Sequence, residues 1–313
     1  MKQKRIAILT LNPGIDRIIY LDGTLDVGGH NRTSHALVNQ GSKGANQAIM
    51  LKNLGYDAVE YFSFTGGPYA SLCESFTSSY GISSHYVKTE CGVRLNVKVI
   101  EGDGRGTELN EVGGPVTKDE LDRLTDELLS GGYDIISLCG SFPQGVEKSV
   151  YNSLITRAKL SGSTVILDAA SDGLSLGALA KPYLIKPNRA ELSAFGFTEV
   201  DTVEKAISAC GKIYEKYGVR VLCTLDKDGS VYVGDEGKYR VTVAPTELRG
   251  FSGAGDAYLA AFIFARLCRE MDIESSLQYG AAAACAKIAL EGTRMPAYSE
   301  HREAMKYVTV ERV

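Results

Sequence analysis

The sequence predicts an α/β fold, with one mostly parallel central sheet flanked by helices and a small second β-sheet placed over it as a lid. Short, β-branched and nearly continuously apolar runs recur along the chain, as expected for strands that are covered on both faces. Stretches with apolar residues at three- and four-residue spacing separate these runs and predict helices. Strands that alternate with helices in this way favour a parallel sheet between helical layers.

The elements of the large sheet follow in order along the chain. The expected strands are Ile6–Leu11, Val59–Phe64, Ile135–Leu138, Thr164–Asp168, Tyr183–Lys186 and Val219–Leu225. The expected helices are Ala45–Leu54, Lys118–Leu129, Ser149–Leu160, Val203–Tyr217 and Asp256–Arg269. Thr117 followed by Glu120 is a capping-box pattern, which supports a helix start at Lys118.

Two stretches, about 17–41 and 86–114, interrupt this alternation and have strand and turn character without a helix. Their expected strands are Ile18–Leu21, Arg32–Val38 and Leu95–Ile100. We interpret them as a small sheet lying off the main one, which is a suitable lid for a binding site. Because no internal repeat or low-complexity linker is visible, residues 1–313 are expected to form a single domain.

Composition excludes several classes of partner. The chain of 313 residues is 44% hydrophobic and 23% charged, and its formal net charge is -4. It has no long basic run, so neither nucleic acid nor an anionic membrane surface is an expected partner. No apolar run approaches the ~20 residues of a membrane span. The 7 cysteines are spread singly without a CxxC pair, which favours a reducing, cytoplasmic setting over disulfides or a zinc site.

The segment Gly253–Asp256 carries the strongest chemical signal. Gly253, Ala254 and Gly255 precede Asp256 at the start of an apolar helix. Backbone N–H groups and the helix dipole favour negative charge at such a turn. An Asp beside this anion site can take a proton from a hydroxyl, an arrangement that suits phosphoryl transfer to an alcohol. The simpler explanation is that Asp256 caps the helix.

Two further clusters stand at ends of predicted elements. Asp16 follows the carboxyl end of the first strand, where α/β proteins bind ligands, and its carboxylate is suited to sugar hydroxyls. Gly41, Ser42 and Lys43 precede a predicted helix that contains Asn46, so N–H groups and a cation meet there. The spacing does not match a P-loop. Taken alone, Asp16 is a turn residue and Lys43 a solvated lysine.

Two clusters offer groups for an anionic substrate. Strand alternation places Arg94, Asn96 and Lys98 on one face, which is either a solvated face or a lid face turned to a site. A guanidinium such as that of Arg94 can hold phosphate bidentately. Ser141 lies in the strand-to-loop transition after Ile135–Leu138 and offers a hydrogen-bond donor.

Lys186, Asn188 and Glu191 form a polar cluster after another predicted strand. If a helix begins at Asn188, its amide and the Glu191 carboxylate share the first turn. Such groups can orient water molecules around Mg²⁺, although helix capping explains them without a ligand. Further along, Thr224, Asp226 and Gly229 lie in an expected hairpin turn with Gly229 at positive φ.

Together and in this order, these clusters resemble the PfkB-type carbohydrate kinases of the ribokinase-like superfamily, from Thr10 to about Thr293. The segments GAGD at Gly253–Asp256, GSKGAN at Gly41–Asn46 and KPNRAEL at Lys186–Leu192 carry the resemblance. It implies a three-layer fold and an ATP- and Mg²⁺-dependent kinase. Asp256 would deprotonate the acceptor, and Gly253, Ala254 and Gly255 would stabilise the transferred group. Residues near the nucleotide would be Lys186, Asn188, Glu191, Thr224, Asp226, Gly229 and Ser252, with Asn188 and Glu191 acting on Mg²⁺ through water.

Segments such as Val93–Lys98 and Gly140–Pro143 resemble the hexose-phosphate branch of that family, which includes 1-phosphofructokinase and tagatose-6-phosphate kinase. The expected acceptor is fructose 1-phosphate, converted to fructose 1,6-bisphosphate, with tagatose 6-phosphate or a neutral sugar or nucleoside as alternatives. The cations and donors expected for the acceptor phosphate are Arg94, Lys43, Arg32 and Ser141. The resemblance also implies a homodimer formed through the lid.

Two residues depart from the family pattern. Ser42 replaces the second of two adjacent glycines, so a Cβ and a hydroxyl stand at a point of close backbone approach. Asp226 replaces a glycine in the nucleotide loop, where a carboxylate would repel phosphates unless it turns to solvent or meets Mg²⁺. These departures leave open a different class of function, a non-catalytic sugar-phosphate sensor on a kinase scaffold.

Overall fold

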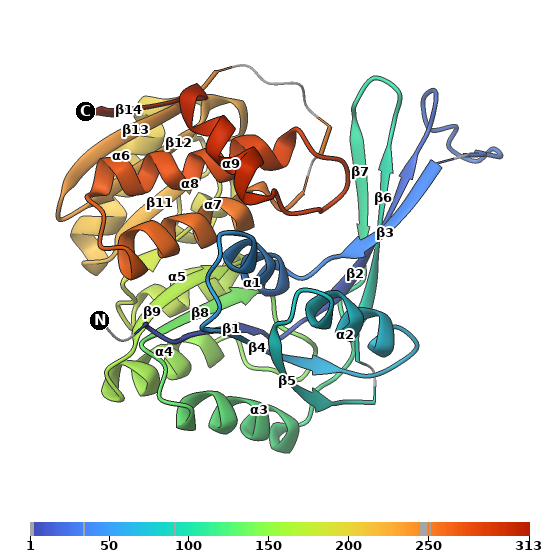
Figure 1. Ribbon diagram of the computed structural model, residues 1–313, viewed down its shortest axis with the longest axis horizontal. Coiled ribbons are helices and arrows are strands. Elements are labelled where there is room, and N and C mark those ends of the chain that lie inside the picture. Colours follow the sequence, from blue (N-terminus) through green and yellow to red (C-terminus); the bar gives the residue numbers. More distant parts are fainter. Residues whose placement is uncertain (1–2, 34, 91, 245–248, 251) are drawn as a thin grey trace.

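A ten-stranded sheet forms the centre of the molecule, and a four-stranded sheet projects from it (Figure 1). The computed structural model describes residues 3–33, 35–90, 92–244, 249–250 and 252–313. The order of the large sheet is β14-β13-β12-β11-β10-β9-β8-β1-β4-β5. In that order its strands are Val308–Arg312, Gly237–Val243, Ser230–Gly234, Arg220–Thr224, Leu184–Ile185, Thr164–Ala169, Ile135–Gly140, Ile6–Thr10, Val59–Thr65 and Ser83–Lys88.

The strands from β11 to β5 run parallel, whereas β12, β13 and β14 are antiparallel additions at one edge. The register of the central strands aligns their ends, since Thr10 lies opposite both Ser63 and Cys139. Cys139 in turn lies opposite Asp168. The carboxyl ends of β1, β8 and β9 therefore meet at one edge of the sheet, where open α/β folds place their ligands.

Helices cover both faces of the large sheet. In chain order, α1 to α9 are Lys43–Asn53, Ala70–Ser78, Lys118–Ser130, Val150–Leu160, Ser171–Ala178, Val203–Tyr217, Ala254–Ile263, Ile273–Ile288 and Tyr298–Ala304. Alternate residues of β1 contribute to two separate cores. Ile6 and Ile8 join the core under α1, α7 and α8, while Ala7 and Leu9 join the core under α3, α4 and α6. The predicted three-layer architecture is confirmed.

The small sheet has the order β3-β2-β6-β7, with strands His35–Gln40, Gly14–Tyr20, Arg94–Ile100 and Gly106–Asn110. In Figure 1 its strands rise from the right-hand side of the body. We call these four strands the lid. The expected second lid segment began at Tyr86, but Tyr86 and Val87 lie in β5 of the large sheet, opposite Ser63 and Phe64. Val87 is buried in the core there, which explains why it does not join the lid.

Two expected boundaries shift for local reasons. β2 begins at Gly14, so Asp16 lies within a lid strand and not in a turn. The predicted helix Asp256–Arg269 starts earlier, at Ala254, and its last turns are a π-helical segment, Phe264–Cys268. Within the described part of the chain, every helix is too short or too polar to cross a membrane.

Candidate active site

The turn before α7 combines a buried carboxylate with a partly exposed helix N-terminus. Gly253 has φ 87 and precedes Ala254 as the N-cap residue, a conformation that glycine adopts without strain. A Cβ on Gly253 would lie 2.8 Å from Cε of Met295, so the turn is also closely packed. Asp256 is buried in the first turn of α7. Backbone N–H groups and a carboxylate thus share one helix start, as the sequence predicted.

Burial raises the pKa of Asp256, because a charged carboxylate is disfavoured away from water. The ammonium of Lys43 opposes this effect, and the charge of Asp168 adds to it. Nδ2 of Asn46 donates a hydrogen bond of 2.9 Å to Oδ2 of Asp256 and also stabilises the ionised form. A carboxylate whose proton affinity is raised and whose orientation is fixed is suited to accept a proton from an alcohol.

Two lysines converge on a carboxylate beside the turn. Nζ of Lys43 lies 2.9 Å and Nζ of Lys186 3.3 Å from Oδ1 of Asp168, which is fully buried. Burial alone would raise the pKa of Asp168, but Lys186 and Lys43 outweigh it and the pKa is lowered. A Cβ on Gly255 would lie 3.1 Å from Nζ of Lys186, so this ammonium adjoins the anion-favouring turn. Positive charge therefore gathers where a phosphoryl group would be held.

The lid contributes a second set of charges. Nδ2 of Asn96 donates a 2.9 Å hydrogen bond to Oδ1 of Asp16, and Nζ of Lys98 lies 2.7 Å from Oδ2. A Cβ on Gly41 would lie 2.3 Å from Oδ1 of Asp16, which explains a glycine at that position. Nζ of Lys98 also donates to Oγ of Ser252 at 2.5 Å. Lys98 thereby links the lid to the turn before α7.

Three further predicted residues make specific contacts around the lid. Oγ of Ser42 is buried and accepts a 3.0 Å hydrogen bond from the backbone N–H of Gly14, so it ties α1 to the start of β2. Nη1 of Arg94 donates to the carbonyl oxygen of Glu111 at 2.7 Å. Oγ of Ser141 accepts a 3.1 Å hydrogen bond from Nδ2 of Asn12.

Most of the predicted nucleotide-side residues lie near the ends of β10 and β11, whereas Ser252 precedes α7 and contacts Lys98 of the lid. Asn188 and Thr224 form a parallel bridge, and Gly229, at φ 86, closes the turn that follows. Asn188 and Glu191 cap each other, since each backbone N–H donates to the other side chain at 2.8 Å. Asp226 has φ 52 and is exposed to solvent. Among the described residues, no group of three or more His, Cys, Asp or Glu side chains could hold a metal ion by itself.

Arg32 is the predicted residue that the structure does not bring to this site. It lies exposed between β2 and β3, beyond Tyr20 and His35. Asp16 is near the opposite end of β2, so Arg32 does not join the groups around Asp16 within the same chain, and its role toward a substrate phosphate stays a prediction. Sequence reasoning could not anticipate this placement, because it did not establish which end of β2 lies near the other site residues.

Buried polar atoms without partners surround the two sets of charges. Within the described residues, Oδ1 of Asn46, Oδ2 of Asp168, Oδ1 of Asn96 and Nε of Arg94 have no hydrogen-bond partner. Leaving such atoms unpaired costs about 1–3 kcal/mol each, and folded proteins rarely leave several together. The four side chains belong to the two groups of charged and polar residues described above, so unsatisfied polar atoms gather at the candidate site.

Sequence reasoning missed three charged residues near the site. Asp168 lies near the carboxyl end of an apolar strand, where α/β proteins bind ligands. The same argument that selected Asp16 would therefore have selected Asp168. Lys98 shares a strand face with Arg94 and Asn96, as the sequence predicted. Because Lys98 is buried and not solvated, this face is the one turned to the site. Lys287 interrupts an alanine-rich run of α8, and a charge inside such a run was an unused signal.

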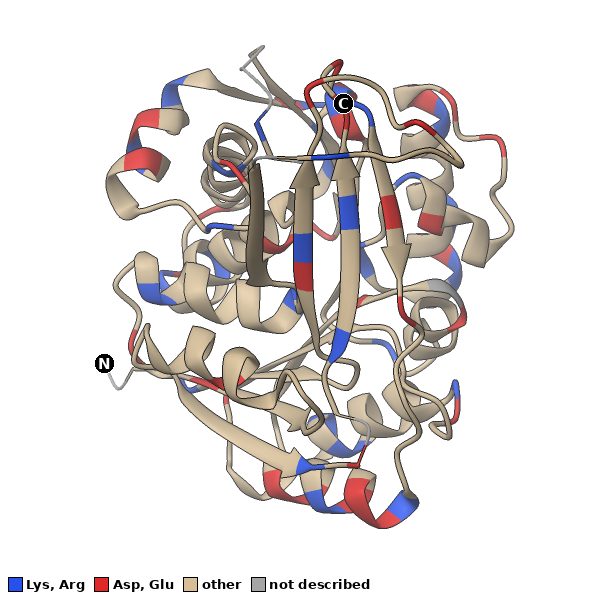
Figure 2. Cartoon of the chain, turned by 90° about the vertical axis from the view of Figure 1, so that its right-hand side faces the viewer, with Lys and Arg blue, Asp and Glu red and all other residues tan. Residues whose placement is uncertain are grey.

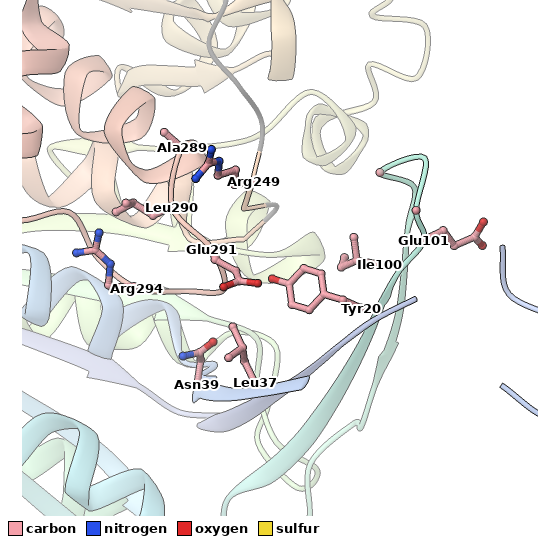
Figure 3. Close-up of a pocket in the computed structure, with 12 residues that line it drawn as sticks. Tyr20, Leu37, Asn39, Ile100, Glu101, Arg249, Ala289, Leu290, Glu291 and Arg294 are labelled. Atoms are coloured by element: carbon pink, nitrogen blue, oxygen red, sulfur yellow. The ribbon is translucent and has the colours of Figure 1, made fainter. Parts of the chain in front are cut away.

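A hollow of about 740 Å³ lies beside these groups and not over Asp256 (Figure 3). Tyr20 and Leu37 line it from the lid, and Leu290, Glu291 and Arg294 line it from the segment after α8. Figure 3 shows the Glu291 carboxylate pointing towards the hydroxyl end of Tyr20. The predicted site residues do not line this hollow, so we assign the candidate active site from the polar groups described above.

Comparison with known proteins defines the class. Residues 9–299 match the model of the pfkB family of carbohydrate kinases, and the chain belongs to that family. It is therefore a carbohydrate kinase. The chain is 29% identical over 269 residues to 1-phosphofructokinase of Escherichia coli strain K12, with coverage of 85% of this chain and 86% of the relative. It is also 29% identical to 1-phosphofructokinase of Haloferax volcanii, with 93% of each chain covered.

Solved structures agree with the fold. Phosphofructokinase-2 from Escherichia coli in complex with substrates and products superposes with a TM-score of 0.88 and 26% identity, covering 96% of this chain and 98% of that one. Ribokinase from Thermotoga maritima superposes with a TM-score of 0.73 at 21% identity, covering 97% and 99%. The expected ribokinase-like fold with a lid is confirmed.

Proposed function

We propose that this chain is an ATP- and Mg²⁺-dependent kinase of phosphorylated hexoses, with fructose 1-phosphate as its acceptor and fructose 1,6-bisphosphate as its product. One observation carries the proposal: Asp256, at the start of α7, is buried and has a raised pKa. It lies between the two lysines that contact Asp168 and the charged residues of the lid. Phosphoryl transfer needs this combination, because its catalysis consists mainly of positioning and charge stabilisation.

Asp256 accepts the proton of the acceptor hydroxyl, and Asn46 holds the carboxylate in place. The N–H groups at Gly253–Gly255 and the ammonium of Lys186 stabilise the negative charge on the transferred group. ATP, bound with Mg²⁺, supplies that group. Asn188, Glu191, Thr224 and Gly229 would hold the nucleotide side, and Glu191 would contact the metal ion through water, as is usual for Mg²⁺.

On the acceptor side, Asp16 is placed to receive hydrogen bonds from sugar hydroxyls, with Asn96 and Lys98 fixing its carboxylate. Arg94, Lys43 and Ser141 are the groups proposed for the acceptor's own phosphate. The partly buried guanidinium of Arg94 supports this, because its Nε lacks a partner in the described chain. The relatives named 1-phosphofructokinase favour fructose 1-phosphate among the hexose phosphates.

The test is ATP turnover against fructose 1-phosphate, fructose 6-phosphate, tagatose 6-phosphate, fructose and ribose, with Mg²⁺ and with chelator. We expect the highest kcat/KM with fructose 1-phosphate and no turnover without the metal. Turnover limited to neutral sugars would overturn the phosphosugar assignment. Calorimetry that shows sugar-phosphate binding without ATP binding would instead favour the non-catalytic sensor.

We also propose that residues 1–313 act as one catalytic domain and that two copies pair through their lids. β7 is exposed along its whole length, and Leu109 on it is 62% exposed. Figure 2, which faces the lid, shows acidic and basic residues interspersed along its strands. A sheet with an uncovered face is stabilised by pairing. Light scattering should give the mass of a dimer, and Leu109→Lys should shift it towards a monomer; a monomeric parent chain would refute the proposal.

A further inference from the structure

Lys287 is a buried charge that the proposed reaction does not use. It lies near the C-terminal end of α8 with 0% of its surface exposed. The same helix is rich in alanine, so nothing in its composition requires a cation there. Removing an ammonium from water costs several kcal/mol unless other groups compensate, so a buried lysine needs a specific environment.

Backbone carbonyl groups provide that environment. Nζ of Lys287 donates to the carbonyl oxygen of Gly292 at 2.9 Å and to that of Leu290 at 3.5 Å. Within the described chain, no carboxylate forms an ion pair with it. Carbonyl oxygens without a counter-ion are the ligands that proteins use for a bare monovalent cation such as K⁺, in place of its water shell.

The ammonium lies directly under the turn that leads into α7. A Cβ on Gly250 would lie 2.8 Å from Nζ of Lys287 and 2.2 Å from the carbonyl oxygen of Leu290. A Cβ on Gly253 would lie 3.5 Å from Cε of Lys287. The lysine therefore spans from the segment after α8 to both glycines of the turn, and its charge lies behind the N-terminus of α7.

Its electrostatic surroundings connect it to the candidate base. Burial lowers the pKa of Lys287 to about 8, and the charges of Lys98 and Arg294 lower it as well. The charge of Asp256 acts in the opposite direction and favours the ammonium. The positive charge of Lys287 thus depends on the same carboxylate that the proposed mechanism ionises.

We propose that Lys287 is a tethered monovalent cation: its ammonium occupies a carbonyl site of the kind that K⁺ fills, and it fixes the positions of Gly250 and Gly253 before the anion-favouring start of α7. Lys287 is a positioning residue, since it acts through the turn. The chain consequently needs no free monovalent cation for turnover. This inference rests on the proposed kinase function, because its main measurement is ATP-dependent turnover.

The experiment compares the parent protein with Lys287→Ala in choline, sodium, potassium and ammonium salts at constant ionic strength. The parent should turn over equally in all four. Lys287→Ala opens the carbonyl site, so it should lose about tenfold or more in kcat/KM in choline and regain most of it in potassium or ammonium. Lys306→Ala, which removes an exposed lysine after α9, is the matched control and should show neither effect.

Lys287→Met keeps most of the side-chain volume but carries no charge and leaves no room for an ion. It should be impaired in every salt, which separates the role of the charge from that of packing. The melting temperature of Lys287→Ala should rise in potassium relative to choline, whereas that of the parent should not, because only the variant has an open ion site. This readout needs no substrate, so it stands even if the proposed acceptor is wrong.

Stimulation of the parent by potassium would overturn the inference. So would a folded Lys287→Ala that is fully active in choline, or one that is impaired and gains neither activity nor thermal stability from potassium or ammonium. If Lys287→Ala does not fold, the test rests on Lys287→Met. Full activity of Lys287→Met in choline then overturns the inference. Loss of activity in Lys287→Met, together with a parent protein whose turnover does not depend on potassium, supports the inference.

Discussion

The turn before α7 and the lid meet at the same site, but their functional groups are assembled in different ways. Gly253, Ala254, Gly255 and Asp256 are consecutive, so the helix start alone brings them together. On the lid, Asp16 lies in β2 and Asn96 and Lys98 lie in β6, and a parallel strand register unites them. Chemistry built within one turn is local, whereas the lid site depends on correct pairing between segments far apart in the chain.

Asp256→Asn tests the local half of this comparison and should have the largest effect. The amide cannot accept a proton, so kcat should fall by about 10²–10⁴-fold, the usual contribution of a general base. The acceptor KM should change little, since the shape of the side chain is kept. Steady-state kinetics measure both, and a melting curve close to that of the parent confirms folding. Turnover near that of the parent would mean that another group takes the proton.

Lys98→Met tests the lid half. It removes the ammonium that lies 2.7 Å from Asp16 and 2.5 Å from Ser252, leaving Asp16 buried without its cation. Breaking such a buried pair typically costs about 3–5 kcal/mol of unfolding free energy. We expect kcat/KM for the acceptor to fall by about 10–100-fold with a smaller change in the KM for ATP, because the lid faces the acceptor.

A double-mutant cycle separates the pair from its parts. Asp16→Asn combined with Lys98→Met should destabilise the protein less than the two single changes added together, because the double variant buries no unpaired charge. Urea denaturation measures each free energy of unfolding. Simple additivity would show that the ion pair does not couple β2 to β6.

The same contrast explains how much the sequence predicted. The central strands, helices α1, α3, α4, α6 and α7, and the turn at Gly253 follow from hydrophobic periodicity and from residues close together in sequence, and they were predicted. Helices α2, α5 and α8 were not among the expected elements. Neither the distance of Arg32 from Asp16 nor the burial of Lys98 was anticipated, because they depend on which end and which face of a lid strand meets the body. Lys287 differs from these two, because its carbonyl partners Leu290 and Gly292 are close in sequence and its charge within an alanine-rich run was a local signal that was not used.

Asn46→Ala links the two regions through pH. The hydrogen bond from Asn46 favours the ionised form of Asp256, so its loss should raise the pKa of that carboxyl further. Because the base must be ionised to work, activity is lost as pH falls through this pKa. The acid limb of the kcat/KM profile should therefore move to higher pH in the variant, with a smaller loss on the alkaline side. An acid limb that stays in place would assign it to a different group.

The smallest effect is expected from Asp226→Asn, which keeps the turn and removes only the charge. Asp226 is exposed at φ 52, a backbone region that asparagine also tolerates, so the fold should be unaffected. An exposed charge is screened by solvent and salt, so the KM for ATP should change by less than about twofold. Asp226→Gly is the matched control for backbone strain and should behave alike. A fall of about tenfold in the KM for ATP in both variants would show instead that the carboxylate faces the phosphates and weakens nucleotide binding, because removing one repulsive charge near them is worth about 1.4 kcal/mol.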